Sequence, residues 1–374
     1  MITKQDLERI MDRPTGEHPV LSLFLDLSVN SDNKRTHHIF LSQKRGQFNE
    51  LDSDRTPHHR EAIGEVFSRV DQWLEEEFEE ENRGVAIYAE IGGEWFEAVQ
   101  FPIAIQNRMV MNDRPVITPL AQVIESYHHH GVILLDREHA RILSVYLGSL
   151  LDEIEVRGTP HPAAHSIQAG GYSQGRYQRR KAEEMRHFFK EFAREAEEFV
   201  NRYKPKDLVI LGTEENVANF REFLSERLQK MVIHTGSMRV DEPAGEVMQK
   251  LQPYLDAERE REGQELVEML RNRVEQDYLA TAGLQSTLIA LQEGKVDTLV
   301  VARDQEREGV RCGTCEFVFA REIAACPYCG SKETEEVDAF EEMIRMAEGQ
   351  GAAVEFVAPD VLGDMRGVGS LLRF

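Results

Sequence analysis

The sequence predicts a protein of mixed α/β and α+β class that is divided into three domains. Its 374 residues exceed the length of one ordinary domain. In the second half of the chain, apolar strand-like runs alternate with long helical patterns, which is typical of α/β layers. All four cysteines lie between residues 312 and 329, which indicates a small metal-binding insert. We place the domains at residues 1–128, 129–256 and 257–374, with the insert at 310–332.

The first domain is predicted to be an α+β module. In "VLSLFLDLS", which starts at Val20, every second residue is leucine, the period of a half-buried strand. Residues 57–82 predict a charged helix, because apolar side chains recur there at helical spacing. These apolar residues are Val66, Val70, Trp73, Leu74 and Phe78. "GVAIYAEIGGEWFEAVQF" predicts two strands joined by a turn at Gly92 and Gly93.

The second domain begins with two predicted strands, "GVILLD" at 131–136 and "ARILSVYLG". A long amphipathic helix follows from about residue 176 to 203, where Lys204 and Pro205 end it. "DLVILG" predicts another buried strand, and a helix continues through residue 228. The charged helical stretch at 254–280 is predicted to connect the second domain to the third.

The third domain is predicted to be a smaller α/β module. It reads as helix "LQSTLIALQEG", strand "VDTLVVA", the cysteine insert, helix "AFEEMIRMAEGQG" and strand "AVEFVA".

The overall charge restricts the classes of partner. A formal net charge of −23 argues against a generic nucleic-acid binder, because the average surface would repel phosphate. Contact with nucleic acid must therefore come from local basic islands. The sequence has no apolar run of transmembrane length, and its N-terminus lacks the apolar core of a signal peptide. We expect a cytoplasmic protein with no membrane partner.

The cysteines form two C-x-x-C pairs. Cys312, Cys315, Cys326 and Cys329 supply four thiolates, and a two-residue gap lets both thiolates of a pair reach one ion. A closed shell of four cysteines suits structural zinc rather than catalysis. The alternative is four buried or reactive thiols without a metal.

The stretch "SIQAGGYSQGRYQRRK", residues 166–181, is the main candidate functional segment. No aspartate or glutamate occurs between Arg157 and Ala182, and the basic residues of this window are Arg157, His161, His165, Arg176, Arg179, Arg180 and Lys181. Cations near the start of a helix oppose the helix dipole, which favours a functional reason for the arginines, such as contact with phosphates.

Three interpretations of this loop remain open. It contains the G-x-S-x-G pattern of a serine hydrolase, but the apolar strand that a nucleophile elbow requires does not precede Gly171. The second interpretation is a glycine-rich surface loop that enters a helix, with Ser173 or Gln174 near the cap. In the third interpretation, a mobile glycine-containing loop delivers Gln174 to an external, negatively charged target.

Paired glycines, a nearby glutamine and an arginine-rich helix resemble the middle-domain tip of archaeo-eukaryotic class 1 peptide chain release factors. The bacterial members are called bacterial archaeo-eukaryotic release factors, and Pelota-type ribosome rescue factors share the architecture. "GVILLDREHARIL", "DLVILGTEENVANF", "LQSTLIALQEGKVDTLVVARD" and "GDMRGVGSLLRF" resemble further segments of the family in the same order. The resemblance covers residues 129 to 374, and residues 1–128 fit more loosely.

This resemblance implies a ribonuclease H-like middle domain. It also implies a C-terminal three-layer α/β domain with a small zinc ribbon insert, which contacts a translational GTPase. The family binds the ribosomal A site, and its loop enters the peptidyl transferase centre to hydrolyse peptidyl-tRNA. Gly170, Gly171, Ser173 and Gln174 are the corresponding catalytic-loop residues, with Gln174 positioning water. Arg176, Arg179, Arg180 and Lys181 are expected to bind large-subunit ribosomal RNA.

The sequence departs from the family pattern in two places. Tyr172 and Ser173 separate the glycines from Gln174, so the loop resembles the glycine-serine-glutamine loop of ribosome quality-control relatives. No convincing counterpart of the stop-codon-reading motif is found; "NSDNKRT" at 30–36 lies in roughly that region. We therefore expect release or rescue without stop-codon specificity. The alternatives are a non-catalytic A-site-binding hibernation or protection factor, and a tRNA 3′-end nuclease.

Two other patterns are interpreted as structural. "YHHHG" at 127–131 is predicted to be a domain-junction loop rather than a metal site. Asp136 ends a strand where ribonucleases place a metal-binding acid, but no clustered acids are identifiable from the sequence.

Overall fold

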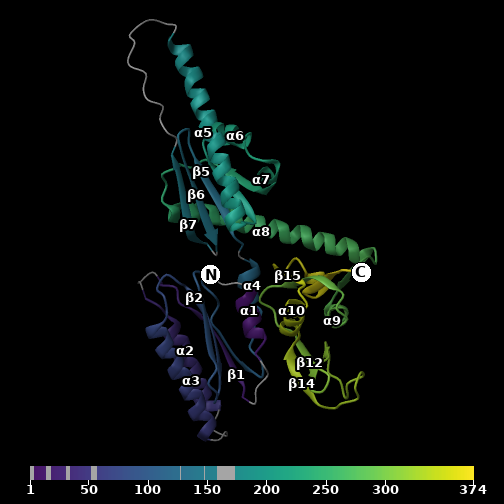
Figure 1. Ribbon diagram of the computed structural model, residues 1–374. Helices are drawn as coiled ribbons and strands as arrows, with labels where there is room; N and C mark the ends of the chain where they lie inside the picture. Colours follow the sequence, from purple (N-terminus) through teal and green to yellow (C-terminus); the bar gives the residue numbers. More distant parts are fainter. Residues whose placement is uncertain are drawn as a thin grey trace. The chain divides into compact units, whose positions relative to one another are not determined.

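Four sheets organise the described chain (Figure 1). A computed structural model describes residues 4–13, 18–30, 34–51, 57–126, 128–146, 148–157 and 173–374. These residues form two compact units. The first unit joins Met1–Ser126 to Arg259–Phe374, and the second unit is Tyr127–Glu258. The three-domain division, which separates residues 1–128 from 257–374, stays a prediction.

The N-terminal sheet of the first unit has the order β3-β2-β1-β4. Its strands are β1 (Val20–Asp26), β2 (Gly84–Glu90), β3 (Phe96–Phe101) and β4 (Arg108–Asn112). The β2–β3 pair is the antiparallel hairpin that the sequence predicted. The helices α2 (His37–Leu51) and α3 (Pro57–Glu76) supply apolar side chains to the core on one side of this sheet.

Strand β1 was predicted to be half-buried, and this was wrong. It is a central strand, paired with both β2 and β4, and residues 20–25 are buried on both faces. The leucines pack into the core with α3, whereas Ser22 on the opposite face accepts a hydrogen bond from Val116 N (2.9 Å). Tyr88 lies on that face too and donates to Val116 O (3.1 Å). The chain around residue 116 therefore covers the face that was expected to be exposed.

Helix α3 is shorter than predicted. It ends at Glu76 instead of continuing to residue 82. A turn replaces its last part: Asn82 N donates to Glu79 O (3.0 Å), and Glu79 N donates to the Gln100 side chain (3.0 Å). This turn leads the chain directly into β2.

The second unit contains one five-stranded sheet with the order β7-β6-β5-β8-β9. Its strands are β5 (His130–Leu135), β6 (His139–Tyr146), β7 (Ser149–Arg157), β8 (Asp207–Gly212) and β9 (Val232–Gly236). β5, β6 and β7 form an antiparallel meander, and β5, β8 and β9 are parallel. This is the ribonuclease H-like arrangement that the resemblance implied, so the prediction is confirmed.

Helices cover both faces of this sheet. On one face α5 (Ser173–Tyr203), α6 (Glu214–Arg221) and α7 (Glu226–Met231) pack against alternate residues of β5, β6 and β8. The other face packs against the start of α8 (Ala244–Glu275) through Val247, Leu251 and Leu255. Gly131 is required where α5 crosses β5, because a Cβ there would lie 2.7 Å from Leu208 and 2.8 Å from Phe199.

The predicted connection at 254–280 falls mostly in α8, which ends at Glu275. The helix begins earlier than predicted, at Ala244, and continues through the boundary between the two units. Its first half packs in the second unit, whereas Val267 and Leu270 pack in the core of the first unit.

The C-terminal sheet of the first unit has the order β10-β16-β11-β15. Its strands are β10 (Ala280–Ala282), β11 (Val296–Ala302), β15 (Ala353–Val357) and β16 (Val368–Leu372). α8 packs against Val300 and Ala302, while α9 (Leu284–Gln292) and α10 (Ala339–Gly349) contact the sheet through its alternate residues. The predicted three-layer α/β arrangement is therefore confirmed.

The cysteine insert forms its own small sheet, with the order β13-β12-β14. These strands are β12 (Glu308–Cys312), β13 (Val318–Phe319) and β14 (Thr334–Asp338). Two N-terminal helices, α1 (Lys4–Met11) and α4 (Thr118–Ser126), contact α10 within the same unit. No described helix is both long and apolar enough to cross a bilayer.

Candidate functional site

The predicted loop residues lie at and before the start of α5. This helix begins at Ser173, three residues earlier than expected, so Gln174 belongs to its first turn and not to a preceding loop. The backbone positions of Arg176, Arg179, Arg180 and Lys181 follow on the next turns. Gly170 and Gly171 lie outside the described residues.

Aromatic packing anchors the opposite half of α5. Phe189 and Phe192 are completely buried, and both contact Phe220 of α6, with ring centroids 5.7 and 5.0 Å apart. Phe188 stacks on Phe192 at 6.1 Å. Within the second unit, α5 runs well past the end of the sheet (Figure 1). The helix is therefore fixed from Phe188 onward, and its first turns extend away from that core.

The C-terminal end of α5 is tied to the sheet by polar contacts. His129 Nδ1 donates to Tyr203 O (2.9 Å), so its Nε2 accepts from the Ser144 hydroxyl (2.8 Å). Burial lowers the pKa of His129 and keeps this neutral tautomer. The Tyr203 hydroxyl also donates to Asp152 and lowers the pKa of that carboxyl group. Both ring nitrogens of His129 thus have structural partners at this junction.

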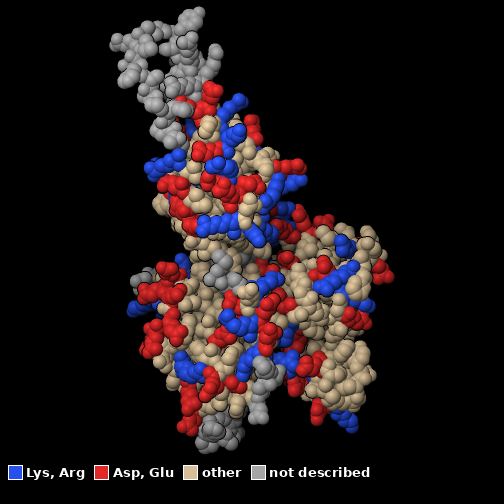
Figure 2. Space-filling view, in the orientation of Figure 1, with Lys and Arg blue, Asp and Glu red and all other residues tan. Residues whose placement is uncertain are grey.

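Arg157 does not belong with the basic residues of the loop. It lies at the end of β7, where its guanidinium pairs with Glu155 (2.8 Å). His161 and His165 lie outside the described residues. On the face of the second unit that Figure 2 shows, Lys and Arg side chains are interspersed with Asp and Glu. The structure does not describe the side chains of residues 176–181.

Asp136 has a structural role at the β5–β6 turn. Its Oδ1 accepts hydrogen bonds from Glu138 N and His139 N, both at 2.8 Å. It also lines a cavity of about 740 Å³ at the carboxyl ends of β5, β8 and β9. Within the described ranges, three or more potential metal ligands gather in one place only, and that place is the cysteine insert.

The four predicted cysteine ligands converge on one point. Their Sγ atoms all lie within 4.8 Å of one another, and the Cys312–Cys329 and Cys315–Cys326 pairs are each 3.5 Å apart. A tetrahedral ion with metal–sulfur bonds of about 2.3 Å needs sulfur atoms about 3.8 Å apart. The arrangement therefore fits one tetrahedral metal ion.

Two local features shape this cysteine cluster. The turn of the first pair is closed by Cys312 N donating to Phe317 O and Glu316 N donating to Cys312 O, both at 2.9 Å. The amides of Cys315 and Thr314 lower the pKa of the Cys312 thiol to about 7. Although the Phe317 amide acts to lower the pKa of Cys315, burial and the neighbouring sulfur atoms raise it to about 12. Adjacent thiolates repel one another, and a divalent cation removes this conflict.

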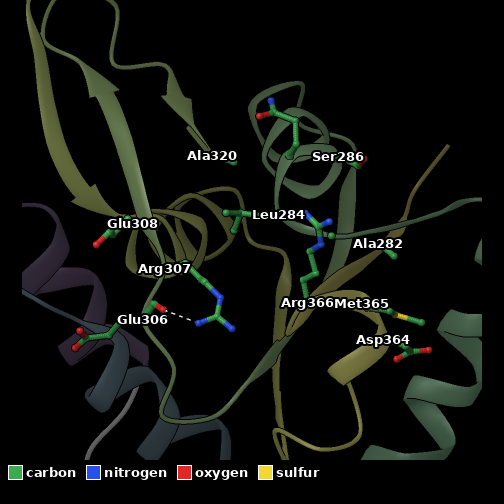
Figure 3. A pocket seen from close by; sticks show the side chains of 12 residues that line it. Ala282, Leu284, Ser286, Glu306, Arg307, Glu308, Ala320, Asp364, Met365 and Arg366 are labelled. Carbon is green, nitrogen blue, oxygen red and sulfur yellow. Dashed lines mark hydrogen bonds between the residues drawn. The ribbon is translucent and has the colours of Figure 1, made fainter. Parts of the chain in front are cut away.

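A cavity of about 760 Å³ lies in the C-terminal part of the first unit (Figure 3). The start of α9, the residues before β12 and the loop at 364–366 form its walls. Arg307 lines it and is held in place by its donation to Glu306 O (3.0 Å). Arg366 lines it from a left-handed backbone position with φ of 58°. This cavity was not predicted from the sequence.

Sequence reasoning also missed the buried charged residues of the first unit. Arg311, Glu341 and Glu342 are 3%, 6% and 7% exposed. Arg311 directly precedes the first metal-site cysteine, but nothing in that position signals burial. Its partners lie far away in the sequence, as described below.

Comparison with known proteins finds similarity to release factors. Residues 115–255 match the model of bacterial archaeo-eukaryotic release factor family 10. Peptide chain release factor subunit 1 of Pyrococcus abyssi is 27% identical over 309 residues, which cover 74% of each chain. The same factor from Methanocaldococcus jannaschii is 27% identical over 292 residues and 69% of each chain. The predicted resemblance is confirmed by these matches.

Solved structures of translation factors are also among the matches. The alignment with a crystal structure of an archaeal translation termination factor spans 100% of this chain and 99% of the other chain, with 17% identity and a TM-score of 0.28. The alignment with the crystal structure of Archaeoglobus fulgidus Pelota spans 78% of this chain and 79% of Pelota, with 15% identity and a TM-score of 0.36.

Proposed function

We propose that this chain, a relative of the archaeal class 1 release factors, is a cytoplasmic, ribosome-associated release or rescue factor that hydrolyses peptidyl-tRNA. The observation that carries the proposal is the position of Gln174. It lies in the first turn of α5, 14 residues before the buried Phe188. At 1.5 Å per residue this places it about 21 Å beyond the aromatic anchor. A helix that is fixed at one end and carries a glycine-glutamine tip at the other is suited to reach into a remote active site.

The chemistry requires little from this chain. The ester of peptidyl-tRNA is already activated, so one amide that orients water and stabilises the developing charge is sufficient. Gln174 supplies that amide, Gly170 and Gly171 let the backbone approach closely, and Ser173 adjoins the reacting group. The ribosome and the tRNA ribose supply the rest of the site. Because the ribosome and the tRNA supply these groups, the chain does not need a catalytic dyad of its own, and none is evident in the sequence.

The basic positions of α5 are proposed to bind large-subunit ribosomal RNA. Residues three and four positions apart share one face of a helix, so positions 176, 179 and 180 fall together and Lys181 adjoins them. Phosphate contacts of this kind orient a protein without reading sequence. They also overcome the repulsion expected from a net charge of −23.

The proposed release does not depend on a stop codon. The only candidate for codon reading, at 30–36, holds an arginine with structural partners: Arg35 donates to Leu27 O (3.0 Å), and its guanidinium lies 5.0 Å from the Phe78 ring centroid. Ribosomes stalled on sense codons are therefore the expected targets. The C-terminal α/β domain is proposed to contact a translational GTPase, as in the family.

Zinc is proposed as the ion of the cysteine insert, because four thiolates in a closed shell are its preferred structural site. Purified protein is expected to contain one zinc per chain, as measured by mass spectrometry of the metal content. Cys312→Ser is expected to lose that zinc, because three cysteines leave the shell open. Zinc content that is equal in wild type and variant would contradict the assignment.

Release from stalled complexes tests the proposed function. Ribosome–nascent chain complexes halted on a sense codon or on a stop codon are incubated with the protein, and free peptide is quantified. The proposal predicts binding to large subunits and comparable release from both complexes. Binding without any release would instead show a protection factor, and release confined to the stop codon would overturn codon independence.

A further inference from the structure

The N-terminal and C-terminal parts of the first unit are joined by a buried carboxylate. Glu341, on α10, accepts hydrogen bonds from Ile117 N (2.7 Å), Thr118 N (3.0 Å) and the Thr118 hydroxyl (2.6 Å). It thereby caps the start of α4, a helix more than 200 positions earlier in the chain. Arg345 adds a hydrogen bond to Pro115 O. Residues 115–118 are therefore docked on α10.

A second junction lies at the base of the cysteine insert. Arg311 precedes Cys312 on β12, and its guanidinium donates to Asp113 of the N-terminal part. The same guanidinium also contacts Glu335 of β14 (2.7 Å) and the buried Glu342 of α10 (3.1 Å). A charge buried to this degree is tolerated only when its partners are held in place. The arginine thus connects three segments that meet at the insert.

A third contact comes from inside the first cysteine turn. Glu316 immediately follows Cys315 and adopts φ of 60°, and its side chain pairs with Arg114 of the N-terminal part (2.8 Å). The direction of this side chain is set by the closed turn between Cys312 and Phe317. Two of the three junctions, at Arg311 and at Glu316, are therefore adjacent in sequence to metal-site cysteines.

The insert has a small core. Its apolar cluster contains three buried residues, Cys312, Phe319 and Cys326, of which two are proposed metal ligands, and Cys315, Phe317 and Ile323 are partly buried against it. Phe317 also packs on Tyr328, with ring centroids 4.0 Å apart. A core of that size does not stabilise a fold in water without a metal or a disulfide. The ion is therefore expected to fix the turns that orient Arg311 and Glu316.

We propose that metal binding by the cysteine insert locks the N-terminal part of the chain onto the C-terminal α/β part. In the metal-bound state the insert presents Arg311 to Asp113 and Glu316 to Arg114. Loss of the metal opens the turns, and the segment 113–126 then loses its contacts with the insert. It keeps its contacts with α10, with β15 and with Ser22 and Tyr88 of the N-terminal sheet. We call the metal-bound insert, residues 310–332, an intramolecular clamp, because it holds the N-terminal part of the first unit on the C-terminal part. The proposal rests on the metal assignment and is independent of peptide release.

Hydrogen exchange on the full-length protein tests the clamp. Amide exchange of residues 113–126 is compared before zinc removal, after treatment with a chelator, and after zinc is restored. Zinc removal is expected to accelerate exchange in this segment by about ten-fold or more, and restoration to reverse it. β5 and β8 of the second unit serve as internal references and are expected to keep their rates. Cys329→Ser, which removes the exposed ligand, gives the same comparison without a chelator.

Two matched variants separate the clamp from general loosening. Glu316→Ala removes the ion pair between the insert and Arg114. Glu306→Ala removes the Glu306–Arg108 pair, which does not involve the insert; both glutamates are 66% exposed. With zinc bound, Glu316→Ala is expected to raise exchange of 113–126 and to respond less to chelation than wild type. Glu306→Ala is expected to respond like wild type. A chain that takes up no metal overturns both proposals, and metal uptake with unchanged exchange of 113–126 overturns the clamp alone.

Discussion

Replacing Gln174 by alanine is expected to lower the rate of nascent-chain release by about 100-fold or more, the size of effect seen when one charge-stabilising donor is removed from an active site. The change removes the amide while leaving a good helix former in the first turn of α5. Binding to the ribosome is expected to persist, because the proposed RNA contacts lie at positions 176–181. Peptide release is measured in single-turnover reactions with stalled ribosome–nascent chain complexes.

Two control variants make this result specific. Gln168→Ala removes the glutamine that precedes the paired glycines and is expected to release peptide at the wild-type rate. Ser173→Ala removes the serine of the G-x-S-x-G pattern and is expected to keep most of the activity. If Gln174→Ala releases peptide as fast as wild type, the role assigned to Gln174 is wrong. Complete loss in Ser173→Ala would instead favour the serine as nucleophile.

Replacing Arg311 by alanine is expected to lower the free energy of unfolding of the first unit by about 3 kcal/mol, since the change leaves Glu342 charged and unpaired in a buried position. Arg108→Ala is the matched control. Arg108 also joins the N-terminal part to the C-terminal part, through Glu306 at 2.5 Å, but this pair is partly exposed and is expected to contribute less than about 1 kcal/mol. Both tryptophans, Trp73 and Trp95, lie in the first unit, so their fluorescence in denaturant reports on it.

The loss of unfolding free energy in Arg311→Ala is expected to depend on pH in one direction. Burial raises the pKa of Glu342, and Arg311 partly opposes that rise. Without the arginine the pKa of Glu342 rises further. Acidification then protonates the buried carboxylate, which removes the unpaired charge and reduces the loss of stability in the variant. The deficit relative to wild type is therefore expected to be larger at pH 8 than at pH 5. An equal loss in Arg311→Ala and Arg108→Ala would contradict the buried network.

Strands with uninterrupted apolar runs could be predicted from the sequence, because burial on both faces leaves a strong local pattern. β5 and β8 were recognised in this way, whereas β11 and β15 were recognised although polar residues interrupt their apolar runs. β7 was missed because it is an edge strand with acidic residues on its exposed face, a pattern that also suits a loop. β9 was missed because its sequence, VIHTG, has only two large apolar residues and none of its residues is fully buried.

Helix boundaries depended on contacts that the sequence does not display. The helix predicted to run through residue 228 is in fact two helices. It is interrupted before Ser225, whose side chain accepts from Leu228 N and starts α7. Helix α2 was missed because its apolar residues do not form a clear stripe. Its packing in the same core as α3 is not visible in the sequence.

The two parts of the candidate site differ in how well they could be predicted from the sequence. The cysteine cluster was predicted because C-x-x-C pairs are local and each closes its own turn. The contacts of Arg311 and Glu341 could not be predicted, because their partners Asp113 and Thr118 lie 198 and 223 positions away. For the loop, the structure moves Gln174 into the first turn of α5, and its catalytic role stays a prediction.

The decisive measurement follows both products of one reaction. Stalled large-subunit complexes carrying labelled peptidyl-tRNA are incubated with the protein, and the released peptide and the tRNA 3′ end are quantified together. We expect free peptide and tRNA with an intact 3′ end, both dependent on Gln174. Peptide that leaves with a fragment of tRNA attached, or a complex that is bound but never hydrolysed, would contradict this expectation.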